Sequence, residues 1–378
     1  MHAFNCLFVY LDGCNLVSNI DTSLNFQAFF YILIRPFSRN AFRRINKGIM
    51  ELLSLELIWL FDWWANNKVQ LFADKEIIEL MGKERALVIC NHRSDIDWLV
   101  GWVLAQHAGC LGSCLAIIKK EILCLPVIGW AMWFSGYIFL QRSWAKDENT
   151  LKSGFEGLND FPLPFWLALF VEGTRFTQAK LFAAQQYAAS VGLPVPRNVL
   201  IPRTKGFVAA VTHLRLHVPA IYNITVAIPK DEPCPTLLRI FRGRSSTVHV
   251  HIKRHLMQEL PETSSGIAQW CKDVFVAKDA LLEQHLETNT FGPGLPHELR
   301  RTKKSLMVVI CWSCFLLGAV VSLLERVPFS WGEVAFCLSF LGITVILMHV
   351  LIMFSQSERS TPPKEHQPDP LNQVLLQN

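Results

Sequence analysis

The strongest constraint on the fold is an apolar run that ends abruptly in a group of polar and ionisable residues. Residues 86–90 read Ala-Leu-Val-Ile-Cys, and residues 91–99 continue as Asn-His-Arg-Ser-Asp-Ile-Asp-Trp-Leu. This pattern is typical of a buried strand that leads through a short loop into a helix. On one continuous helix, His92 and Asp97 would lie about 140° apart. Their side chains can therefore meet only if His92 is in the loop and Asp97 is in the first helical turn.

Ser94 agrees with this arrangement. It can cap the helix with Asp97 at the third helical position, a capping box in which Asp replaces the usual Glu. Asp97 can then orient the His92 ring and hold one tautomer, as an acid does for a catalytic histidine. A structural interpretation stays open beside this one. A capping serine, an aspartate near a helix amino terminus and a partly buried histidine occur together in many strand-to-helix turns.

Composition and two long apolar segments predict a membrane protein. The chain has 378 residues, of which 51% are hydrophobic and 18% are charged, which is more apolar than an ordinary soluble enzyme. Residues 305–324 and 334–354 contain no Asp, Glu, Lys or Arg, and each has about the 20 residues that a spanning helix needs. We therefore expect a C-terminal transmembrane hairpin. Basic residues outside both ends of the hairpin place the bulk of the chain in the cytosol.

The remaining chain divides by composition. Residues 1–67 hold only short or interrupted apolar stretches, without an evident signal peptide, and indicate an in-plane or re-entrant membrane anchor. Residues 355–378 are polar with several prolines, which is typical of a disordered tail. The expected parts are a membrane-associated segment, a globular domain, the hairpin and a disordered cytosolic tail, at residues 1–67, 68–296, 305–354 and 355–378.

The globular part alternates apolar runs with helical patterns. Candidate buried strands are residues 86–90, 167–171, 198–201, 220–228 and 248–252. Candidate helices are residues 95–106, 147–160, 179–191, 266–271 and 275–287. The alternation predicts an α/β fold, a mixed sheet flanked by helices, with membrane-embedded N-terminal helices and the transmembrane hairpin attached. The charge-free residues 124–140 are expected to be buried or membrane-dipping structure beside the site.

Four groups of polar residues each follow an apolar stretch. They are His92 with Asp97; Gly136, Phe139 and Arg142; Glu172, Gly173, Thr174 and Arg175; and Pro202 with Lys205. In open α/β sheets, ligands bind beyond the carboxyl ends of the strands. The groups can therefore converge on one crevice.

The residue types point to a definite chemistry. His92 can take a proton from an alcohol, and Arg142, Arg175 and Lys205 supply positive charge for a phosphate. Gly173 allows the backbone to approach a ligand closely. This combination suits an acceptor that has both a hydroxyl and a phosphate and that attacks an activated acyl group. Each group also has a purely structural interpretation, such as a surface cation, a turn or an internal ion pair.

Other sites and functions are weaker. Cys90 lies at a strand position that favours a buried, unreactive thiol, and the 11 cysteines form no disulfide or zinc framework. His249 and His251 share one strand face, with His255 nearby, but no further ligands for zinc are evident. A lipase would show a Gly-x-Ser-x-Gly elbow, which the chain lacks. The net charge of +5 suits anionic phosphates or an anionic membrane surface rather than requiring nucleic acid. A non-catalytic membrane scaffold stays a further alternative.

Together the four groups resemble a known signature set. His92 and Asp97 look like the HX4D motif of glycerophospholipid acyltransferases, and Gly136, Phe139 and Arg142 look like their GxxFxxR motif. Residues 172–175 read Glu-Gly-Thr-Arg, and Pro202 centres the fourth block. The resemblance covers most of residues 65–285. The chain is similar to the 1-acyl-sn-glycerol-3-phosphate acyltransferases, also called lysophosphatidic acid acyltransferases, and especially to the plant endoplasmic-reticulum type.

The resemblance implies a membrane acyltransferase. It implies an α/β domain with an N-terminal membrane-embedding motif and an acyl tunnel, in a multi-pass protein of the endoplasmic reticulum whose catalytic domain faces the cytosol. Acyl-CoA is the implied co-substrate, lysophosphatidate the acceptor and the lipid bilayer a partner, with no cofactor, metal or acyl-enzyme. The reaction is acyl transfer to the sn-2 hydroxyl, giving phosphatidate and CoA. A different lysophospholipid head group is the alternative.

The resemblance also implies a role for each motif residue. His92 is the general base and Asp97 orients it. The acceptor phosphate is held by Arg175 with Arg142 and Lys205. The implied phosphate pocket also includes Glu172, Gly173 and Thr174, and the implied pocket-shaping residues are Gly136, Phe139 and Pro202.

Overall fold

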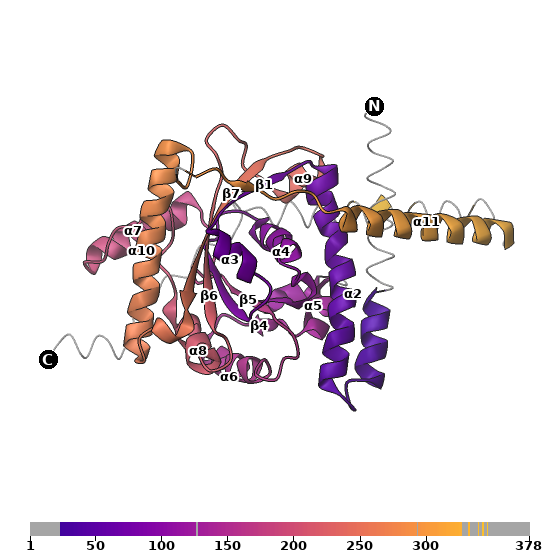
Figure 1. The fold of residues 1–378 in the computed structure, drawn as a ribbon, viewed down its shortest axis with the longest axis horizontal. Helices are drawn as coiled ribbons and strands as arrows, with labels where there is room; N and C mark the ends of the chain where they lie inside the picture. The colour runs from indigo at the N-terminus through magenta and orange to yellow at the C-terminus, as the bar shows by residue number, and fades with distance from the viewer. Residues whose placement is uncertain are drawn as a thin grey trace.

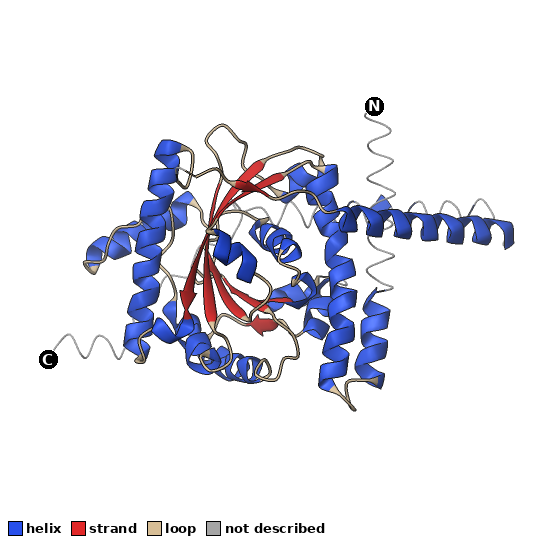
Figure 2. Ribbon diagram, viewed as in Figure 1, coloured by secondary structure: helices blue, strands red, loops and turns tan. Residues whose placement is uncertain are grey.

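The fold is built on a single mixed sheet of eight strands in the order β4-β3-β5-β2-β6-β7-β1-β8 (Figures 1 and 2). A computed structural model describes residues 23–125, 128–292 and 294–326, with isolated positions beyond them. The strands are β1 (Lys68–Phe72), β2 (Ala86–Cys90), β3 (Cys114–Lys119), β4 (Ile138–Leu140), β5 (Trp166–Leu169), β6 (Ala220–Ala227), β7 (Thr247–Leu256) and β8 (His297–Glu298).

Strand β2 lies inside the sheet and has all five of its residues buried. It pairs in parallel with β5 on one side and with β6 on the other. The pairing of β6 with β7 is antiparallel, and β1 runs parallel to β7. Strands with parallel partners on both sides are buried on both faces, which explains the unbroken apolar run in β2. The predicted mixed α/β sheet with flanking helices is confirmed.

Helices cover both faces of the sheet. In Figures 1 and 2, α7 and α10 lie on one side of the strands, and α4 and α2 lie on the other. Besides a helix over residues 23–33, the α-helices are α2 (Arg39–Trp59), α3 (Lys75–Leu80), α4 (Asp97–His107), α5 (Ile128–Ser135), α6 (Trp144–Glu156), α7 (Gln178–Ser190), α8 (Thr204–Leu214), α9 (Leu237–Phe241), α10 (Ser264–Thr288) and α11 (Lys303–Arg326).

The long helix α10 shows how local sequence sets an element. The Thr263 side chain accepts a hydrogen bond from the Gly266 N–H at its start, and Asn289 adopts the left-handed conformation at its end. The first is a standard start signal of a helix, and the second is a standard stop signal. Its buried residues recur at three- and four-residue spacing and include Lys278. The sequence predicted two helices here, residues 266–271 and 275–287, and the structure has one.

Most of the predicted strands are confirmed, and one is wrong. Strand β2 has the predicted bounds, and strands β5, β6 and β7 overlap the predicted residues 167–171, 220–228 and 248–252. Residues 198–201 form no strand. Their backbone N–H groups bond to side chains instead, with Asn198 and Val199 donating to Asp279 and Leu200 donating to Glu172. The apolar run is therefore buried as a tethered loop.

Four strands were not predicted: β1, β3, β4 and β8. Strands β1, β4 and β8 have five residues or fewer and hold no apolar run longer than three residues, whereas β3 does hold the apolar run Cys-Leu-Ala-Ile-Ile and was missed. The charge-free residues 124–140 form the short helix α5 followed by β4, with residues 126 and 127 outside the described set. On α5, Ala131 is buried whereas Trp130 and Trp133 are exposed. This segment is half-buried structure at the edge of the sheet.

The predicted transmembrane hairpin is wrong. Across the described residues, no helix combines the length and the apolar composition needed to cross a membrane. This finding also overturns the predictions of membrane-embedded N-terminal helices and of a multi-pass protein of the endoplasmic reticulum. The second predicted span, residues 334–354, and residues 1–22 and 355–378 lie largely or wholly outside the described residues.

Helix α11 explains why segment length was misleading. The helix covers the first predicted span, but it begins at Lys303 and ends at Arg326. Lys304 lies 3.7 Å from the Glu51 carboxylate of α2, and Ser305 is fully buried. Val308 packs against the hydrophobic core. The first turns of the charge-free segment are therefore part of the packing of the protein.

Candidate active site

His92 and Asp97 meet beyond the carboxyl end of β2. His92 is in the loop, Asp97 is the first residue of α4, and His92 Nδ1 lies 2.8 Å from Asp97 Oδ2. The His92 ring also stacks on Phe170, with 4.3 Å between ring centroids. The imidazole is 19% exposed and the carboxylate is buried. The ring is thus fixed through Nδ1 and one face, which leaves Nε2 as the nitrogen available for chemistry.

The start of α4 differs from the predicted capping box. Helix α4 begins at Asp97 rather than at Asp95, and its N-cap residue, Ile96, makes no side-chain cap. Ser94 donates its N–H to Asp97 Oδ2 at 2.8 Å and its hydroxyl to the Pro235 carbonyl at 2.7 Å. Of the two hydrogen bonds of a capping box, only the one from the Ser94 N–H to the acidic side chain is present. Asp97 therefore bonds to the His92 ring and to the loop backbone at once.

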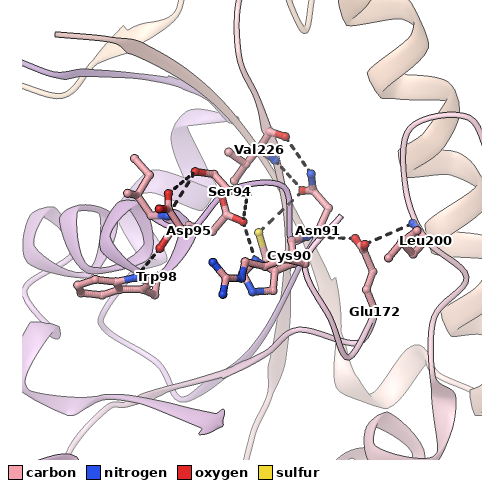
Figure 3. A network of polar contacts seen from close by, with 12 residues as sticks. Cys90, Asn91, Ser94, Asp95, Trp98, Glu172, Leu200 and Val226 are labelled. Atoms are coloured by element: carbon pink, nitrogen blue, oxygen red, sulfur yellow. Dashed lines mark hydrogen bonds and ion pairs between the residues drawn. The ribbon is translucent and has the colours of Figure 1, made fainter. Parts of the chain in front are cut away.

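Glu172 joins three segments beneath His92. Its carboxylate accepts the His92 N–H at 3.1 Å and the Leu200 N–H at 3.3 Å. Figure 3 shows Glu172 between the loop that carries Asn91 and the backbone of Leu200. The residue is 2% exposed, and burial raises the pKa of its carboxyl to about 8, against the two N–H groups, which lower it. Glu172 thus supports the loop rather than facing solvent.

Backbone hydrogen bonds connect three of the four predicted groups. The Phe176 N–H donates to the His92 carbonyl at 2.7 Å, and the Arg203 N–H donates to the Val171 carbonyl at 2.7 Å. Between them, Gly173 has a φ of 69°, and a Cβ there would lie 2.9 Å from Arg203 Cδ. This position therefore requires glycine both for its left-handed backbone and for the close approach of Arg203.

The Arg175 guanidinium lies in the same electrostatic neighbourhood as the histidine pair. Burial lowers its pKa, the carboxylates of Asp95 and Asp97 raise it, and Arg142 lowers it. Lys180, on α7, donates its Nζ to Thr174 Oγ1 at 2.8 Å and to the Arg175 carbonyl at 3.0 Å. Burial lowers the pKa of Lys180, with Arg175 and Arg142 adding to the effect. Three cations are therefore close enough to affect one another.

The backbone of the GxxFxxR group is left-handed at its first and last motif residues. Gly136 has a φ of 90° and Arg142 a φ of 62°. Phe139 lies between them in β4 and is half-buried. A left-handed backbone is unusual for a non-glycine residue and marks a held conformation. Arg142 itself is exposed.

The fourth group joins the site only in part. Pro202 is half-buried, directly before the Arg203 N–H that bonds to Val171. Lys205 is exposed at the start of α8, and its Nζ lies 5.7 Å from the ring centroid of Trp144 on α6. In the structure, the Lys205 ammonium therefore lies next to the ring of Trp144.

Several residues of the site were not singled out from the sequence. Phe170 stacks on His92, and Lys180 holds the Arg175 turn. Asn91 bonds to Val226 through both its amide atoms, at 2.9 and 2.8 Å, which anchors the loop to β6. Burial raises the pKa of the Asp95 carboxyl, with Arg175 lowering it. Of these residues, Asn91, Asp95 and Phe170 sit inside or beside the recognised motifs, and that position was the available signal.

The alternative sites have limited chemistry. Cys90 is buried, and burial raises the pKa of its thiol well above the usual value, so it is a poor nucleophile. His249 Nδ1 lies 2.9 Å from His285 Nε2, a pair the sequence did not suggest. Among the described residues, no group of three or more His, Cys, Asp or Glu side chains could hold a metal ion.

A histidine–aspartate pair beside cations can deprotonate an alcohol on a molecule that also carries negative charge. Two protein-family models agree with this chemistry. Residues 70–228 match the model of the Acyltransferase family, and residues 239–312 match that of the Acyltransferase C-terminus. A solved acyltransferase structure from Thermotoga maritima aligns at a TM-score of 0.44 and 16% identity, over 75% of this chain and 98% of that one.

Curated relatives are more similar. The chain is 61% identical to 1-acyl-sn-glycerol-3-phosphate acyltransferase 2 of Arabidopsis thaliana over 341 residues, covering 90% of this chain and 88% of the relative. It is 56% identical to acyltransferase 3 of the same plant, covering 98% of each chain. Identity to the human acyltransferase gamma is 35%, covering 84% of each. The chain belongs to the 1-acyl-sn-glycerol-3-phosphate acyltransferase family.

Proposed function

We propose that this chain transfers an acyl group from acyl-CoA to the sn-2 hydroxyl of 1-acyl-sn-glycerol 3-phosphate, releasing phosphatidate and CoA. The observation that carries the proposal is the 2.8 Å contact between His92 Nδ1 and Asp97 Oδ2, in the electrostatic range of Arg175. The names of the relatives support the choice of acceptor.

The reaction follows from the tautomer that Asp97 selects. With the proton on Nδ1, His92 Nε2 takes the proton of the acceptor hydroxyl while the oxygen attacks the thioester carbon. The C–S bond then breaks, and His92 returns the proton to the departing CoA sulfur. The transfer needs no covalent acyl-enzyme and no metal ion.

The basic residues hold the acceptor in this proposal. Arg175 and Arg142 bind its phosphate, because paired guanidinium donors match phosphate oxygens, and Lys205 contributes at the edge. Thr174 adds a hydroxyl, while Glu172 and Gly173 fix the turn that presents Arg175. Pocket shape is assigned to Gly136, Phe139 and Pro202.

A lipid surface is the proposed partner, because both substrates carry acyl chains. The helix over residues 23–33 exposes Phe26, Phe29, Ile32 and Leu33. Its Tyr31 ring packs 5.3 Å from the ring of Trp133 on α5, which is itself exposed. Adjacent exposed aromatic and aliphatic groups favour contact with a lipid interface. Co-sedimentation with phospholipid vesicles, lost on replacing Phe29 and Trp133 with Ser, would test it.

The direct test is a panel of acceptors. The purified chain is incubated with one acyl-CoA and with lysophospholipids that differ only in head group. We expect phosphatidate as the main product, and we expect the His92→Ala variant to be inactive at equal protein level. Preference for another head group would support the alternative acceptor, and an active His92→Ala variant would remove the mechanism.

A further inference from the structure

The loop over residues 197–200 runs between α10 and the proposed site, outside the sheet. Asn198, Val199 and Leu200 are buried. Buried backbone N–H groups need hydrogen-bond partners, and a loop outside the sheet has no strand ladder to supply them. In this loop, side-chain carboxylates are the partners instead.

Asp279 of α10 holds the first part of the loop. Its carboxylate accepts the N–H groups of three successive residues, Arg197, Asn198 and Val199, at 3.0, 2.6 and 3.1 Å. Successive backbone N–H groups that converge in this way form a concave site for an anion, and here a carboxylate of the same chain occupies it. Hydrogen bonds to a carboxylate are stronger than hydrogen bonds to a neutral oxygen, so Asp279 is the main tether of this segment.

Leu200 connects the loop to the proposed base. Its N–H donates to one oxygen of Glu172 at 3.3 Å, and the His92 N–H donates to the other oxygen at 3.1 Å. Figure 3 shows the Glu172 carboxylate bonded to Leu200 on one side and to the loop of Asn91 on the other. A continuous path of hydrogen bonds and backbone therefore runs from Asp279 to the residue that carries the imidazole.

Packing alone does not fix the loop. An apolar cavity of about 440 Å³ opens between the loop and α10, and the residues that line it include Val199, Leu200, Phe275 and Asp279. Where such a space separates two segments, the dispersion contacts of a close-packed interface are missing. The hydrogen bonds to Asp279 therefore determine where the Leu200 N–H meets Glu172.

We propose that Asp279 is a positioning residue for acyl transfer: its carboxylate fixes the backbone of residues 197–199, so that Leu200 and Glu172 hold the His92 backbone in place. The inference rests on the proposed function for its kinetic readout. Asp279 touches no substrate and acts through the contact between Leu200 and Glu172.

The turn that presents Arg175 has separate tethers. The Arg203 N–H donates to the Val171 carbonyl at 2.7 Å, and Lys180 donates its Nζ to the Arg175 carbonyl at 3.0 Å. Neither hydrogen bond involves Asp279 or residues 197–199. Loss of the Asp279 carboxylate should therefore affect the chemical step more than the binding of the phosphorylated acceptor.

The test replaces Asp279 with Ala, which removes the acceptor for all three N–H groups. We expect kcat to fall about 10- to 100-fold, because a small displacement of a catalytic group is costly, while the KM for each substrate stays within about threefold of wild type. Asp273→Ala is the matched control. Asp273 is an exposed residue of the same helix whose carboxylate accepts a hydrogen bond from Gln269, one turn earlier, and its variant should keep full activity. Each variant is assayed well below its own thermal midpoint.

A double-variant cycle identifies the route. Glu172→Gln keeps the shape of the side chain, but its amide nitrogen cannot accept a hydrogen bond, so it no longer holds Leu200 and His92 together. In that background, Asp279→Ala should cause less than a threefold further loss of kcat. Losses that multiply in full would overturn the proposal, and so would a wild-type kcat in Asp279→Ala. Asp279→Asn, which keeps one accepting oxygen, should retain more activity than Asp279→Ala.

Hydrogen exchange gives a readout that does not depend on turnover. In Asp279→Ala, exchange should be faster in the peptide that contains residues 197–200 and also in the peptide around His92, relative to wild type and to Asp273→Ala. Faster exchange confined to residues 197–200 would mean that Asp279 supports only its own loop, and would contradict the positioning role. If the wild-type chain transfers no acyl group, the proposed function fails, while the exchange at His92 still decides whether Asp279 fixes that backbone.

Discussion

The two ends of strand β2 carry buried charge in opposite ways. Just before its amino end, Glu84 accepts the Tyr222 hydroxyl at 2.6 Å and two N–H groups of Arg254, each at 2.8 Å. Just beyond its carboxyl end, Asp97 and Glu172 bond to the loop of His92. One strand therefore joins an acidic cluster at each end.

The clusters differ in how far their hydrogen-bonding capacity is used. Burial raises the pKa of Glu84, but the Arg254 and Tyr222 hydrogen bonds and the Arg254 charge outweigh it, and the net pKa lies below the ordinary value. At the carboxyl end burial prevails, and the pKa of Glu172 is raised. Asp97 Oδ1 is buried without a hydrogen-bond partner in the described part of the chain. The cluster at the amino end, whose carboxylate is fully hydrogen-bonded, stabilises the sheet. The cluster at the carboxyl end keeps that unpaired oxygen and a carboxyl with a raised pKa, which is typical of a site that takes part in a reaction.

The largest expected effect is a loss of kcat from a substitution that disrupts the carboxyl-end cluster while the chain stays folded. Asp97→Asn should lower kcat about 10³- to 10⁴-fold, because the amide no longer selects the proton on His92 Nδ1. The free energy of unfolding should change by less than about 1 kcal/mol, since the substitution removes a buried charge and the isosteric amide oxygen can still accept the Ser94 N–H. Kinetics and urea denaturation on the same preparation check both. A kcat within tenfold of wild type would refute the orienting role.

The amino-end cluster should respond in the opposite sense. Glu84→Gln should lower the free energy of unfolding by about 2–3 kcal/mol, because Arg254 loses its ionic partner in a largely buried setting. Acyl transfer well below the melting temperature should be unchanged. Glu79→Gln, which removes an exposed pair with Lys75 at 4.0 Å, is the control and should cost less than about 0.5 kcal/mol.

The pH dependence of the Glu84 variant sharpens the comparison. The pKa of Glu84 is lower in the folded chain than its ordinary value of 4.5. Its contribution to stability is therefore fully present above that ordinary value and is lost as the pH falls through the folded-state pKa. The stability difference between wild type and Glu84→Gln should shrink in acid. A difference that grows in acid would show that the pair does not act through charge.

A smaller effect separates binding from chemistry within the carboxyl-end cluster. Arg175→Ala should raise the KM for the phosphorylated acceptor about 10- to 100-fold, as expected for a lost charge-assisted contact. The KM for acyl-CoA should change little, and Arg175→Lys should lie between the variant and wild type. A change confined to acyl-CoA would mean that Arg175 does not hold the acceptor phosphate.

The sequence predicted the cluster at the carboxyl end of β2 better than the cluster at its amino end. His92, Asp97 and residues 172–175 follow apolar runs directly, so the parallel strands β2 and β5 bring them to one edge. The Glu84 cluster joins residues 138 and 170 positions apart in the chain, and no local pattern marks such a contact. The buried Lys278 was missed for the same reason, because the Ile224 carbonyl that accepts its Nζ lies on β6, 54 positions away in the chain. The prediction of a transmembrane hairpin was wrong because the length of a charge-free segment does not reveal whether the first turns of the helix pack on α2.

The smallest expected effect concerns Lys205, which sequence order alone groups with Arg175. Both follow an apolar stretch, but Lys205 is exposed and its Nζ lies over the Trp144 ring. A cation over an exposed ring is worth only about 0.5–1 kcal/mol. Lys205→Met should therefore change the KM for the acceptor by about threefold or less, with a similarly small change in stability, in contrast to Arg175→Ala in the same assay. If the two variants raised KM equally, Lys205 would reach the acceptor phosphate directly, and the phosphate-binding residues would extend from the turn after β5 to the start of α8.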